Sequence, residues 1–350
     1  MVEDSFPMVS VIAPCRNEAP FIENTLNSIL QGDYPTDRLE LFVVDGMSTD
    51  GTREIVQRMA AQNSRIKLLD NPAWIQATAM NIEIKAACGQ YILRIDCHST
   101  FASDYVSNCV EVLERTGAAC VGGYLETLPG SNTLTGQAIA LATATRFGVG
   151  GAKSRIGADK EQESDGLPFG AFQADVFEKV GIYHPLLVRN QDMELYSRIR
   201  KAGLKLIISP KIKVRYYNRG TFKKLRRQAF ANGLWNAYQL CIVGGGLRPR
   251  HLIPACFVIG LTLLGVLGFS VRGKAAVPFW LYTGLYLLIG ITESVRIALR
   301  ERKLILAPFI LITFVQLHLW YGWGTLWGFL TGPIKFRKDR PAVDVQDAGR

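Results

Sequence analysis

Three aspartates, each near an apolar run typical of a strand, are the residues of this chain best suited to chemistry. Asp45 lies in VVDGMSTDGT, Asp96 in RIDCH and Asp192 in NQDMELYSRIR. In open α/β sheets, ligands collect where the carboxyl ends of the strands meet the following loops, so carboxylates far apart in sequence can converge there. We expect Asp45 to bind a nucleotide, Asp96 to hold a metal ion and Asp192 to act as a base.

The first part of the chain alternates apolar runs with helical patterns. Strand-like runs occupy residues 9–13, 41–45, 66–69 and 91–96, and a helical pattern follows each of them. Four strand-then-helix units imply a parallel sheet covered on both faces. Asp50 and Thr52 are candidates for capping the helix after the second strand. The sequence therefore predicts an α/β fold with a mostly parallel central sheet.

The pattern becomes mixed between about residues 121 and 218, where short strands surround a polar loop at 153–166. We interpret this part as the acceptor side of the site. The loop is long for a connection within a compact domain, which favours a mobile lid or an acceptor-contacting loop, with disorder as the alternative.

Charged residues are absent from three stretches of the C-terminal third. These stretches are residues 252–271, 275–292 and 304–334. Each approaches or exceeds the length of about 20 apolar residues that a helix needs to cross a bilayer. The prediction is an α/β domain over 1–220, an interfacial helix and juxtamembrane segment over 221–250, a membrane domain over 251–334 and a basic tail over 335–350. The three apolar segments of that membrane domain run over about 252–271, 275–292 and 304–330.

The net charge of +10 favours an anionic partner. Basic residues crowd the part before the first apolar segment, at Lys223, Lys224, Arg226, Arg227, Arg248 and Arg250. No nucleic-acid recognition motif accompanies them and apolar segments follow directly, so phospholipid headgroups are the expected partner, with a solvated basic face as the alternative.

The seven cysteines include no C-x-x-C pair, which argues against a disulfide framework. The N-terminus lacks a basic region followed by an apolar stretch, so no cleaved signal is expected. We therefore expect the α/β domain to face the reducing cytoplasm.

Six motifs in a fixed order resemble glycosyltransferase family 2, most closely its ExoA-like members of bacterial exopolysaccharide synthesis. They are APCRNE (13–18), VVDGMSTDGT (43–52), RIDCH (94–98), PFGAFQADVFEKVG (168–181), RNQDMELYSRIRKAG (189–203) and the stretch up to Trp235. Each motif is weak alone, and the ordered set is strong. The resemblance implies a GT-A (Rossmann-like) fold, a UDP-sugar donor, a divalent metal and transfer with inversion at the anomeric carbon.

The resemblance also implies a set of residues that bind the nucleotide sugar. They are Pro14, Arg16, Asn17, Glu18, Asp45, Ser48 and Asp96. Asp45 matches the family's aspartate that accepts a hydrogen bond from the uracil ring, and residues 14–18 match the loop around base and ribose. A helix N-cap is the alternative for Asp45, and a favourable interaction with a helix dipole is the alternative for Glu18.

Asp96 and His98 match the metal-binding motif, as D-x-H in place of the usual D-x-D. Imidazole suits Mn²⁺ better than Mg²⁺, which favours manganese. The alternative is an aspartate that caps the next turn, with His98 at the surface. We interpret Cys97, between them, as a small packing residue.

Asp192 matches the family's catalytic base, although an amide, Gln191, replaces the acidic residue that precedes it in many relatives. An inverting displacement needs a carboxylate that takes the proton of the acceptor hydroxyl and a positive group that stabilises the departing diphosphate. Glu194 competes for the role of base, but capping or a salt bridge to Arg198 at i+4 is the interpretation that we favour.

Acceptor and diphosphate contacts are implied by the last motifs. The acceptor candidates are Gly170, Ala171, Gln191 and Trp235, with a tight turn as the alternative for the first two. Arg226 and Arg227 are candidates for contacting the diphosphate. The Q-x-x-R-W motif of processive synthases is absent from this part of the chain, which favours the addition of a single sugar.

The combined prediction is a multi-pass inverting glycosyltransferase of a bacterial inner membrane with a cytoplasmic catalytic domain. It transfers one sugar from a UDP-sugar to a polyprenyl-diphosphate-linked saccharide in exopolysaccharide or cell-surface glycan synthesis. The alternatives are a polyprenyl-phosphate sugar synthase, a processive polysaccharide synthase and a non-catalytic membrane scaffold. The donor sugar, the linkage, and association with a second copy or with other pathway enzymes stay open.

The third apolar segment conflicts with the positive-inside rule. If all three segments spanned the membrane, the basic tail would lie outside. Because this segment contains Pro308, His318 and several glycines, we expect a re-entrant hairpin or a broken helix. We interpret His318 as a packing residue.

Overall fold

The computed structural model describes residues 6–336 except 98, 158 and 271–275, and it divides into two compact units. The first, here called the sheet unit, comprises the chain up to Glu126 and residues 157–216. The second, the helical unit, comprises residues 127–156 and, of the described chain, residues 217–336. The structure thus groups residues 127–156 with the C-terminal helices, whereas the prediction placed them in the α/β domain.

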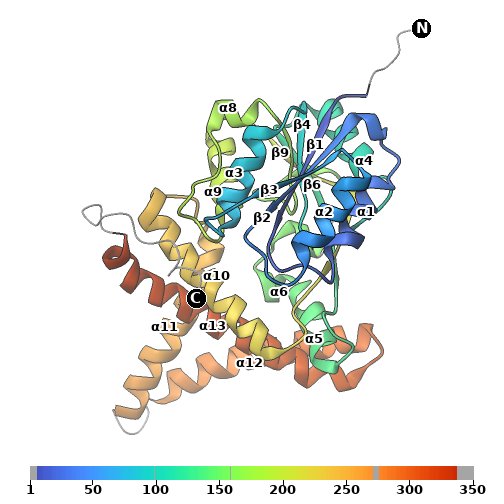
Figure 1. Ribbon diagram of the computed structural model, residues 1–350. Helices are drawn as coiled ribbons and strands as arrows, with labels where there is room; N and C mark the ends of the chain where they lie inside the picture. The colour runs from blue at the N-terminus through green and yellow to red at the C-terminus, as the bar shows by residue number, and fades with distance from the viewer. Residues whose placement is uncertain (1–5, 98, 158, 271–275, 337–350) are drawn as a thin grey trace. The chain divides into compact units, whose positions relative to one another are not determined.

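A nine-stranded sheet forms the core of the sheet unit (Figure 1). Its strands are β1 (Val9–Cys15), β2 (Leu39–Asp45), β3 (Ile66–Asp70), β4 (Tyr91–Arg94), β5 (Ser99–Phe101), β6 (Cys120–Leu128), β7 (Gln162–Glu163), β8 (Ala171–Gln173) and β9 (Leu206–Tyr217). The order is β3-β2-β1-β4-β8-β6-β9-β5, with β7 beside β9. The pairs β1–β2, β1–β4 and β2–β3 are parallel, which confirms the predicted parallel units. The pairs that β8, β5 and β7 make are antiparallel, so the sheet is mixed.

Helices cover both faces of this sheet (Figure 1). One face carries α1 (Ile22–Leu30), α2 (Thr52–Gln62) and α4 (Tyr105–Thr116), and the other carries α3 (Gln76–Ala86), α8 (Val176–Val180) and α9 (Gln191–Lys201). Val11 and Ala13 of β1 pack into the first core, and Ile12 packs into the second. Because alternate residues of a strand face opposite sides, a strand that is covered on both sides is apolar throughout. This explains why β1 and β2 appear in the sequence as continuous apolar runs.

Residues 153–166, predicted as a polar loop, contain a short helix, α7 (Lys153–Ile156), and strand β7. β7 pairs with Ile207 and Ile208 of β9. Just before it, Glu161 accepts a hydrogen bond from the Arg115 guanidinium at 2.6 Å. The part of this segment from residue 161 onward is therefore held against the sheet.

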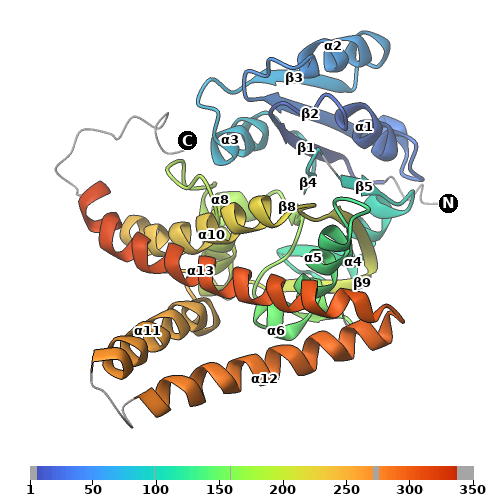
Figure 2. The same cartoon turned by 90° about the horizontal axis from the view of Figure 1, so that it is seen from below.

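The helical unit is built around one long helix, α13 (Ala307–Lys335). The other α-helices are α5 (Leu134–Thr143), α6 (Arg146–Val149), α7 (Lys153–Ile156), α10 (Phe222–Val243), α11 (Pro249–Ser270) and α12 (Val277–Arg300). Figure 2 shows α10 alongside α13, with α11 and α12 on the other side of α13. Ala138 and Ala142 of α5 pack with Ile310 and Phe314 of α13 in one apolar cluster. This apolar face of α5 is the physical reason that residues 127–156 belong to the helical unit.

The third apolar segment forms one continuous helix, so the predicted hairpin or break is wrong. Pro308 lies in the first turn of α13, where a missing backbone N–H removes no helical hydrogen bond. The glycines serve close packing instead. A Cβ atom at Gly324 would collide with the carbonyl oxygen of Phe230, and one at Gly322 with that of Pro254. Small residues let helix backbones approach closely, which accounts for the glycines without a break.

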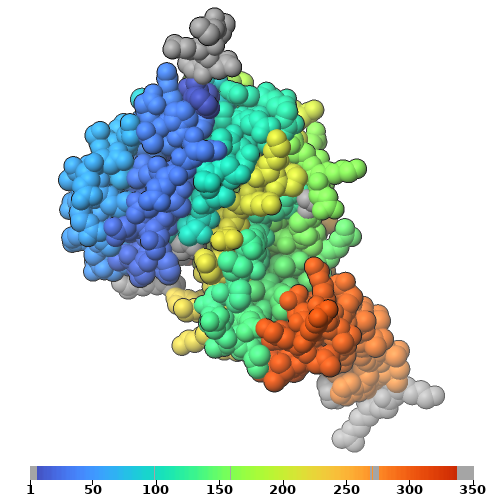
Figure 3. All heavy atoms as spheres, turned by 90° about the vertical axis from the view of Figure 1, so that its right-hand side faces the viewer, coloured from blue at the N-terminus to red at the C-terminus, as the bar shows by residue number. Residues whose placement is uncertain are grey.

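Within the described part of the chain, two helices are long and apolar enough to cross a membrane, at Pro249–Gly268 and Leu304–Lys335. In each of them, 22% of the most apolar window is buried inside the structure. Residues 277–292 of the second predicted segment lie in α12, which continues into a charged end. Leu281 and Leu288 of α12 are nevertheless 68% and 62% exposed. Figure 3 shows atoms of the orange part of the chain, which includes α12, on the side that faces the viewer.

The predicted interfacial helix is α10, and its buried side packs on α13. The hydroxyl oxygens of Tyr238 and Thr331 lie 3.0 Å apart, and the amide of Asn236 donates a hydrogen bond to the hydroxyl of Tyr321. Trp235 is buried with its ring edge-on to that of Tyr238. Protein contacts along α13 therefore hold this helix.

Candidate active site

Asp45, at the end of β2, is fully buried and both of its carboxylate oxygens have partners. The backbone N–H of Ser48 donates to Oδ2 at 2.9 Å, and the Ser48 hydroxyl donates to Oδ1. The Arg53 guanidinium lies 2.9 Å from Oδ2 and also pairs with Asp70 at 2.8 Å. These hydrogen bonds to Asp45 and Asp70 raise the pKa of Arg53. Because the Asp45 side chain is fully buried, a direct contact with a nucleobase requires neighbouring groups, among them Ser48 and Arg53, to move.

The loop after β1 is hydrogen-bonded to the loop after β2. The backbone N–H of Asn17 donates to the Ser48 hydroxyl at 2.8 Å, and that of Glu18 donates to the Thr52 hydroxyl at 2.9 Å. Asp50 accepts hydrogen bonds from the Thr52 hydroxyl at 2.5 Å and from its N–H at 3.1 Å, but the N-cap of α2 is Gly51, without a side-chain cap, so the predicted capping by Asp50 or Thr52 is wrong. The bond from the Thr52 hydroxyl also lowers the pKa of Asp50. The structure thus brings together the predicted residues Asn17, Glu18 and Ser48.

Backbone strain marks the same region. In the described part of the sheet unit, the non-glycine residues with left-handed φ are Asn17 (54°), Met47 (57°), Trp74 (62°), Phe169 (47°) and Asn190 (60°). Such conformations cost about 1–3 kcal/mol each and cluster at functional sites. All except Trp74 are, or directly adjoin, predicted site residues, so backbone geometry supports the position of the site independently of the motifs.

Trp74 is a candidate residue that the sequence analysis missed. The guanidinium carbon of Arg16 lies 4.6 Å from the centre of its ring, a cation–π contact. The side chain is 43% exposed in the loop after β3, so part of the indole remains accessible. No motif or spacing connected residue 74 with residue 16. Pro14, also predicted for the nucleotide, accepts a hydrogen bond at its carbonyl from the Cys97 thiol at 3.5 Å.

Arg94, the last residue of β4, joins Asp96 to Asp192. Its Nη2 lies 2.9 Å from Oδ1 of Asp96, and its Nη1 lies 3.8 Å from Oδ2 of Asp192. The Arg94 side chain is 9% exposed, whereas that of Asp192 is 34% exposed. The structure therefore brings two predicted site residues together through a buried cation to which the sequence analysis assigned no role.

Asp96 lies two residues beyond Arg94, just past the end of β4, and the backbone brings the two side chains together. Ile95, between them, is fully buried, and its N–H donates to the carbonyl of Ile12 at 2.9 Å. Side chains two residues apart in an extended strand point to the same side. This i, i+2 spacing of a charged pair at the end of an apolar strand is the signal that could have identified Arg94.

The group formed by Arg94, Asp96 and Asp192 carries more negative than positive charge. Burial alone would lower the pKa of Arg94, but attraction to Asp96 and then to Asp192 raises it above its ordinary value. Nearby, Glu83 of α3 is fully buried and accepts the N–H of Ala13 at 3.0 Å. Burial raises the pKa of Glu83 well above its ordinary value, which favours its neutral form. One guanidinium and two carboxylates remain, and their net charge of minus one attracts a cation.

Asp96 is the predicted metal ligand that the structure describes, because His98 lies outside the described residues. Among the residues that are described, no three His, Cys, Asp or Glu side chains group so that they could hold a metal ion. Asp96 is 18% exposed, and Arg94 binds only its Oδ1. Divalent ions are often held by one or two carboxylates together with substrate phosphates, and a single available oxygen fits that arrangement. Cys97 is 2% exposed, which confirms it as a packing residue.

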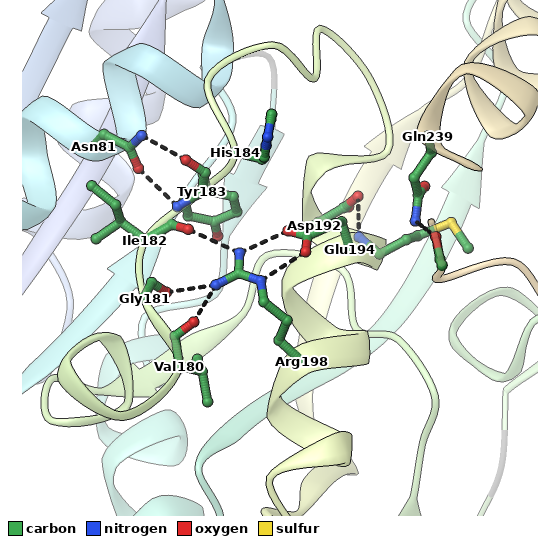
Figure 4. A network of polar contacts seen from close by, with 12 residues as sticks. Asn81, Val180, Gly181, Ile182, Tyr183, His184, Asp192, Glu194, Arg198 and Gln239 are labelled. Carbon is green, nitrogen blue, oxygen red and sulfur yellow. Dashed lines mark hydrogen bonds and ion pairs between the residues drawn. The ribbon is translucent and has the colours of Figure 1, made fainter. Parts of the chain in front are cut away.

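Asp192 and Glu194 both lie in the first turn of α9 but have different partners (Figure 4). Two nitrogens of Arg198 bind the two oxygens of Glu194 at 2.7 Å each, which confirms the predicted pair at i+4. Arg198 also donates to the carbonyls of Gly181 and Ile182 at 3.0 and 2.8 Å. Glu194 is 6% exposed. Of the two carboxylates, Asp192 is the one that a substrate can reach.

Packing explains three of the predicted acceptor residues. A Cβ atom at Gly170 would lie 2.8 Å from the sulfur of Cys120, so only glycine fits. Ala171 is fully buried in β8. The Gln191 amide donates to the side chain of Gln76 at 2.7 Å and is 4% exposed. Contact with an acceptor stays a prediction for these residues.

Comparison with known proteins agrees with this geometry. Residues 10–176 match the family model for glycosyl transferase family 2. The chain is 30% identical over 330 residues to the succinoglycan biosynthesis protein ExoA of Rhizobium meliloti, covering 94% of this chain and 96% of that protein. The chain belongs to glycosyltransferase family 2. It is a glycosyltransferase of polysaccharide or glycan biosynthesis, as the motifs predicted.

Two further similarities extend over nearly the whole glycosyltransferase. A Methanococcus voltae enzyme is 24% identical over 339 residues, covering 94% of this chain and 99% of that enzyme; its name is dolichyl N-acetyl-α-D-glucosaminyl phosphate 3-β-D-2,3-diacetamido-2,3-dideoxy-β-D-glucuronosyltransferase. A mannosyltransferase from Pyrobaculum calidifontis, solved with GDP-Man and Mn²⁺, superposes with a TM-score of 0.58 at 23% identity, covering 91% of this chain and 88% of that chain. The second similarity confirms the predicted GT-A fold.

The remaining site candidates of the glycosyltransferase lie in the helical unit. Arg226 and Arg227 occupy the first half of α10, where Arg226 is half-buried and Arg227 is exposed. Trp235 lies further along the same helix and is buried. These residues are thus carried by a different unit from Asp96 and Asp192, and their contacts with substrate stay predictions.

Proposed function

We propose that this glycosyltransferase moves one sugar, with inversion, from a UDP-sugar to a hydroxyl group of a polyprenyl-diphosphate-linked saccharide in exopolysaccharide or cell-surface glycan synthesis. The observation that carries the proposal is the pairing of Arg94 with Asp96 at 2.9 Å and with Asp192 at 3.8 Å. Inverting transfer needs a base beside a site that binds positive charge, because a proton leaves the nucleophile while negative charge develops on the departing diphosphate.

Asp192 is the proposed base. Its carboxylate, 34% exposed, takes the proton of the acceptor hydroxyl as that oxygen attacks the anomeric carbon. The bond between the anomeric carbon and the diphosphate oxygen breaks on the opposite side, so the configuration inverts. Glu194 does not compete, because Arg198 binds both of its oxygens.

The donor is proposed to bind at the loops after β1 and β2. The residues assigned to it are Pro14, Arg16, Asn17, Glu18, Asp45, Ser48 and Asp96. Asp45 acts through Ser48 and Arg53, whose positions it fixes by hydrogen bonds. Arg16 and the exposed ring of Trp74 add a stacked cationic and aromatic surface, which suits a nucleobase or a diphosphate.

Asp96 and His98 are the proposed ligands of a divalent ion, with Mn²⁺ preferred over Mg²⁺ because of the imidazole. When bound, such an ion neutralises charge on the leaving diphosphate. A fold of this kind holds GDP-Man and Mn²⁺ together in the Pyrobaculum calidifontis mannosyltransferase, which supports an ion that accompanies the donor.

A lipid-linked acceptor is supported by a relative and by the apolar helices. The name of the Methanococcus voltae enzyme describes transfer to a dolichyl-linked N-acetylglucosaminyl phosphate. The helices at Pro249–Gly268 and Leu304–Lys335 are long and apolar enough to lie in a bilayer beside a prenyl chain. We assign the acceptor to Gly170, Ala171, Gln191 and Trp235. Arg226 and Arg227 are assigned to a diphosphate, either that of the acceptor or that of the donor.

The same helices support a location in a membrane. We propose a multi-pass protein of a bacterial inner membrane, with the sheet unit in the cytoplasm where nucleotide sugars are made and the basic residues of α10 near anionic phospholipid headgroups. All seven cysteines are free thiols, as suits a reducing compartment.

The test is nucleotide release by the purified full chain in detergent. UDP-sugars and GDP-sugars are supplied with and without Mn²⁺, together with a polyprenyl-diphosphate saccharide, a polyprenyl phosphate or a lipid-free saccharide. The expected result is metal-dependent release of UDP from one sugar donor with the diphosphate-linked saccharide, addition of a single residue, and loss of turnover in Asp192→Asn.

Other outcomes identify the alternatives. Transfer to polyprenyl phosphate that survives Asp192→Asn indicates a lipid-phosphate sugar synthase, because that acceptor is already ionised and needs no base. Products extended by many sugars indicate a processive synthase. Absence of turnover with every donor and acceptor contradicts the proposal and favours a scaffold.

A further inference from the structure

Arg94 places one guanidinium between two carboxylates that have different tasks in the proposed reaction. Its Nη2 contacts Asp96, the proposed cation ligand, at 2.9 Å, and its Nη1 faces Asp192, the proposed base, at 3.8 Å. The side chain is 9% exposed, so water and salt screen these interactions less than at the surface. A change in the charge at either carboxylate therefore changes the interaction of Arg94 with the other.

The surroundings leave Asp96 and Asp192 as the carboxylates that act most strongly on Arg94. Tyr183 and Tyr196 also face it, but burial raises the pKa of both phenols, so they stay neutral. The buried atom Nε of Arg94 has no hydrogen-bond partner within the described residues. The backbone is fixed, since the N–H of Arg94 donates to the carbonyl of Gly170 at 3.1 Å. The side chain can thus shift between its two partners while the strand stays in place.

We propose that Arg94 is a positioning residue that couples cation binding at Asp96 to the alignment of the base Asp192; the inference rests on the function proposed above. Without a cation, the guanidinium is held mainly by Asp96, the closer partner. With a divalent ion held at Asp96, the added positive charge would disfavour the guanidinium beside that carboxylate, and Arg94 would transfer its interaction to Asp192. The base is then held in place only when the donor and its ion are present.

Arginine suits this task better than lysine. Its guanidinium is a rigid planar fork whose two terminal nitrogens can bind two acceptors at once, whereas lysine offers one compact ammonium. An Arg94→Lys variant retains the positive charge but loses the geometry that serves both carboxylates. This variant therefore separates the effect of the positive charge from the effect of one side chain binding Asp96 and Asp192 at once.

Thermodynamic linkage makes the coupling measurable without turnover. If Arg94 competes with the ion for Asp96, Arg94→Gln tightens Mn²⁺ binding. If Asp192 draws Arg94 away from Asp96, Asp192→Asn returns the guanidinium to Asp96 and weakens Mn²⁺ binding. Coupling free energies between sites typically correspond to factors of about 5–150, so we expect a change of about fivefold or more in each case.

The experiment measures Mn²⁺ affinity of the full chain in detergent at saturating UDP, from the EPR signal of free Mn²⁺ and corrected for binding to UDP alone. The proteins are the wild type, Arg94→Gln, Asp192→Asn and the double variant. We expect opposite shifts in the two single variants, and a change of less than about twofold when Asp192→Asn is added to Arg94→Gln, because the residue that transmits the effect is gone.

Direct attraction between Asp192 and the ion gives a different result. It weakens Mn²⁺ binding by the same factor in the presence and absence of Arg94, and that additive outcome overturns the proposal. If Arg94→Gln does not fold, Arg94→Lys replaces it in the experiment. We expect Arg94→Lys to tighten Mn²⁺ binding as well, by a smaller factor.

Kinetics and a matched control exclude a purely structural role. Arg94→Lys is expected to lower kcat about tenfold or more with the donor KM within a factor of about three, as for loss of an interaction made in the transition state.

Arg198→Lys, which alters the structural pair with Glu194, is the control and should lower thermal stability without changing Mn²⁺ affinity. Parallel losses of stability, Mn²⁺ affinity and kcat in Arg94→Lys and Arg198→Lys overturn the inference. Turnover that persists in Asp192→Asn rejects the proposed function instead, while the Mn²⁺ affinities still report on the coupling.

Discussion

The sheet unit contains two acidic sites that hold their charge in opposite ways. At the end of β2, Asp45 is fully buried and each of its oxygens already has a partner in Ser48 or Arg53. At the end of β4, one guanidinium serves two partly exposed carboxylates, Asp96 and Asp192. Arg53 also pairs with Asp70, so both sites have one guanidinium for two carboxylates, but the buried Asp45 is fully hydrogen-bonded and fixes the shape of two loops. The second site leaves both of its carboxylates partly exposed, so it is the one that changes when a cation or substrate binds.

Asp192→Asn should separate the two sites most strongly. The amide keeps the size of the side chain but cannot take a proton, so we expect kcat to fall by about 10²–10⁴-fold, the usual contribution of a general base. Donor KM and thermal stability should stay close to wild type. Steady-state kinetics and thermal melts check this, and a kcat within threefold of wild type would remove Asp192 from the chemistry.

Arg53→Ala should affect the site around Asp45 mainly by lowering the stability of the protein. It leaves the buried carboxylate of Asp45 without its cation, and because Arg53 is partly exposed we expect a loss of about 2–3 kcal/mol in the free energy of unfolding, below the range for fully buried pairs. Donor KM should rise, with kcat changed little. Arg58→Ala on the same helix is the matched control, since Arg58 pairs with the exposed Glu23 at 2.8 Å. Equal effects of the two substitutions would contradict a special role for Asp45.

Glu194→Gln tests whether proximity to Asp192 is enough for catalysis. Arg198 loses its buried carboxylate partner but keeps its backbone carbonyls, so we expect about 1–2 kcal/mol less stability with kcat within about threefold of wild type. Glu23→Gln, which weakens an exposed pair, should change stability by less than about 1 kcal/mol. A large fall in kcat at full stability would instead move the base to Glu194.

Ser48→Ala should give the smallest effect. It removes the hydroxyl that joins Asp45 to the backbone of Asn17, a loss of about 1 kcal/mol, or about fivefold in donor affinity if the loops must be ordered to bind. Ser28→Ala is the control, because the Ser28 hydroxyl bonds only to the nearby carbonyl of Thr25 at 2.7 Å. Unchanged UDP affinity in a calorimetric titration of Ser48→Ala would show that this bridge does not order the donor loops.

The comparison also shows which parts of the site a sequence can predict. Asp45, Asp96 and Asp192 could be recognised because acidic residues near the ends of apolar runs form a local pattern. The i, i+2 spacing could have related Arg94 to Asp96, but its contact with Asp192 could not be predicted, because that contact depends on α9 reaching β4 from almost a hundred residues further along the chain. The stacking of Arg16 on Trp74 likewise joins two loops that no spacing relates.

The helical unit also shows that local sequence patterns predict some features and not others. Its apolar segments were recognisable because length and lack of charge are local properties. The proline and glycines of the last segment suggested a break, but they lie in the first turn and at close helix contacts, where they are compatible with a continuous helix. Whether a glycine breaks a helix or packs it depends on the neighbouring helix, which only the tertiary structure supplies.

By itself, the sequence determined the parallel strand-then-helix units, the family and the order of the site motifs, because these depend on residues close together in the chain. Only the tertiary structure decided that Asp45 is sealed by Ser48 and Arg53, that Asp96 and Asp192 share Arg94, and that residues 127–156 join the helical unit. Burial and charge pairing act between elements that are distant in sequence, and they depend on distances of a few ångströms that exist only once the chain has folded.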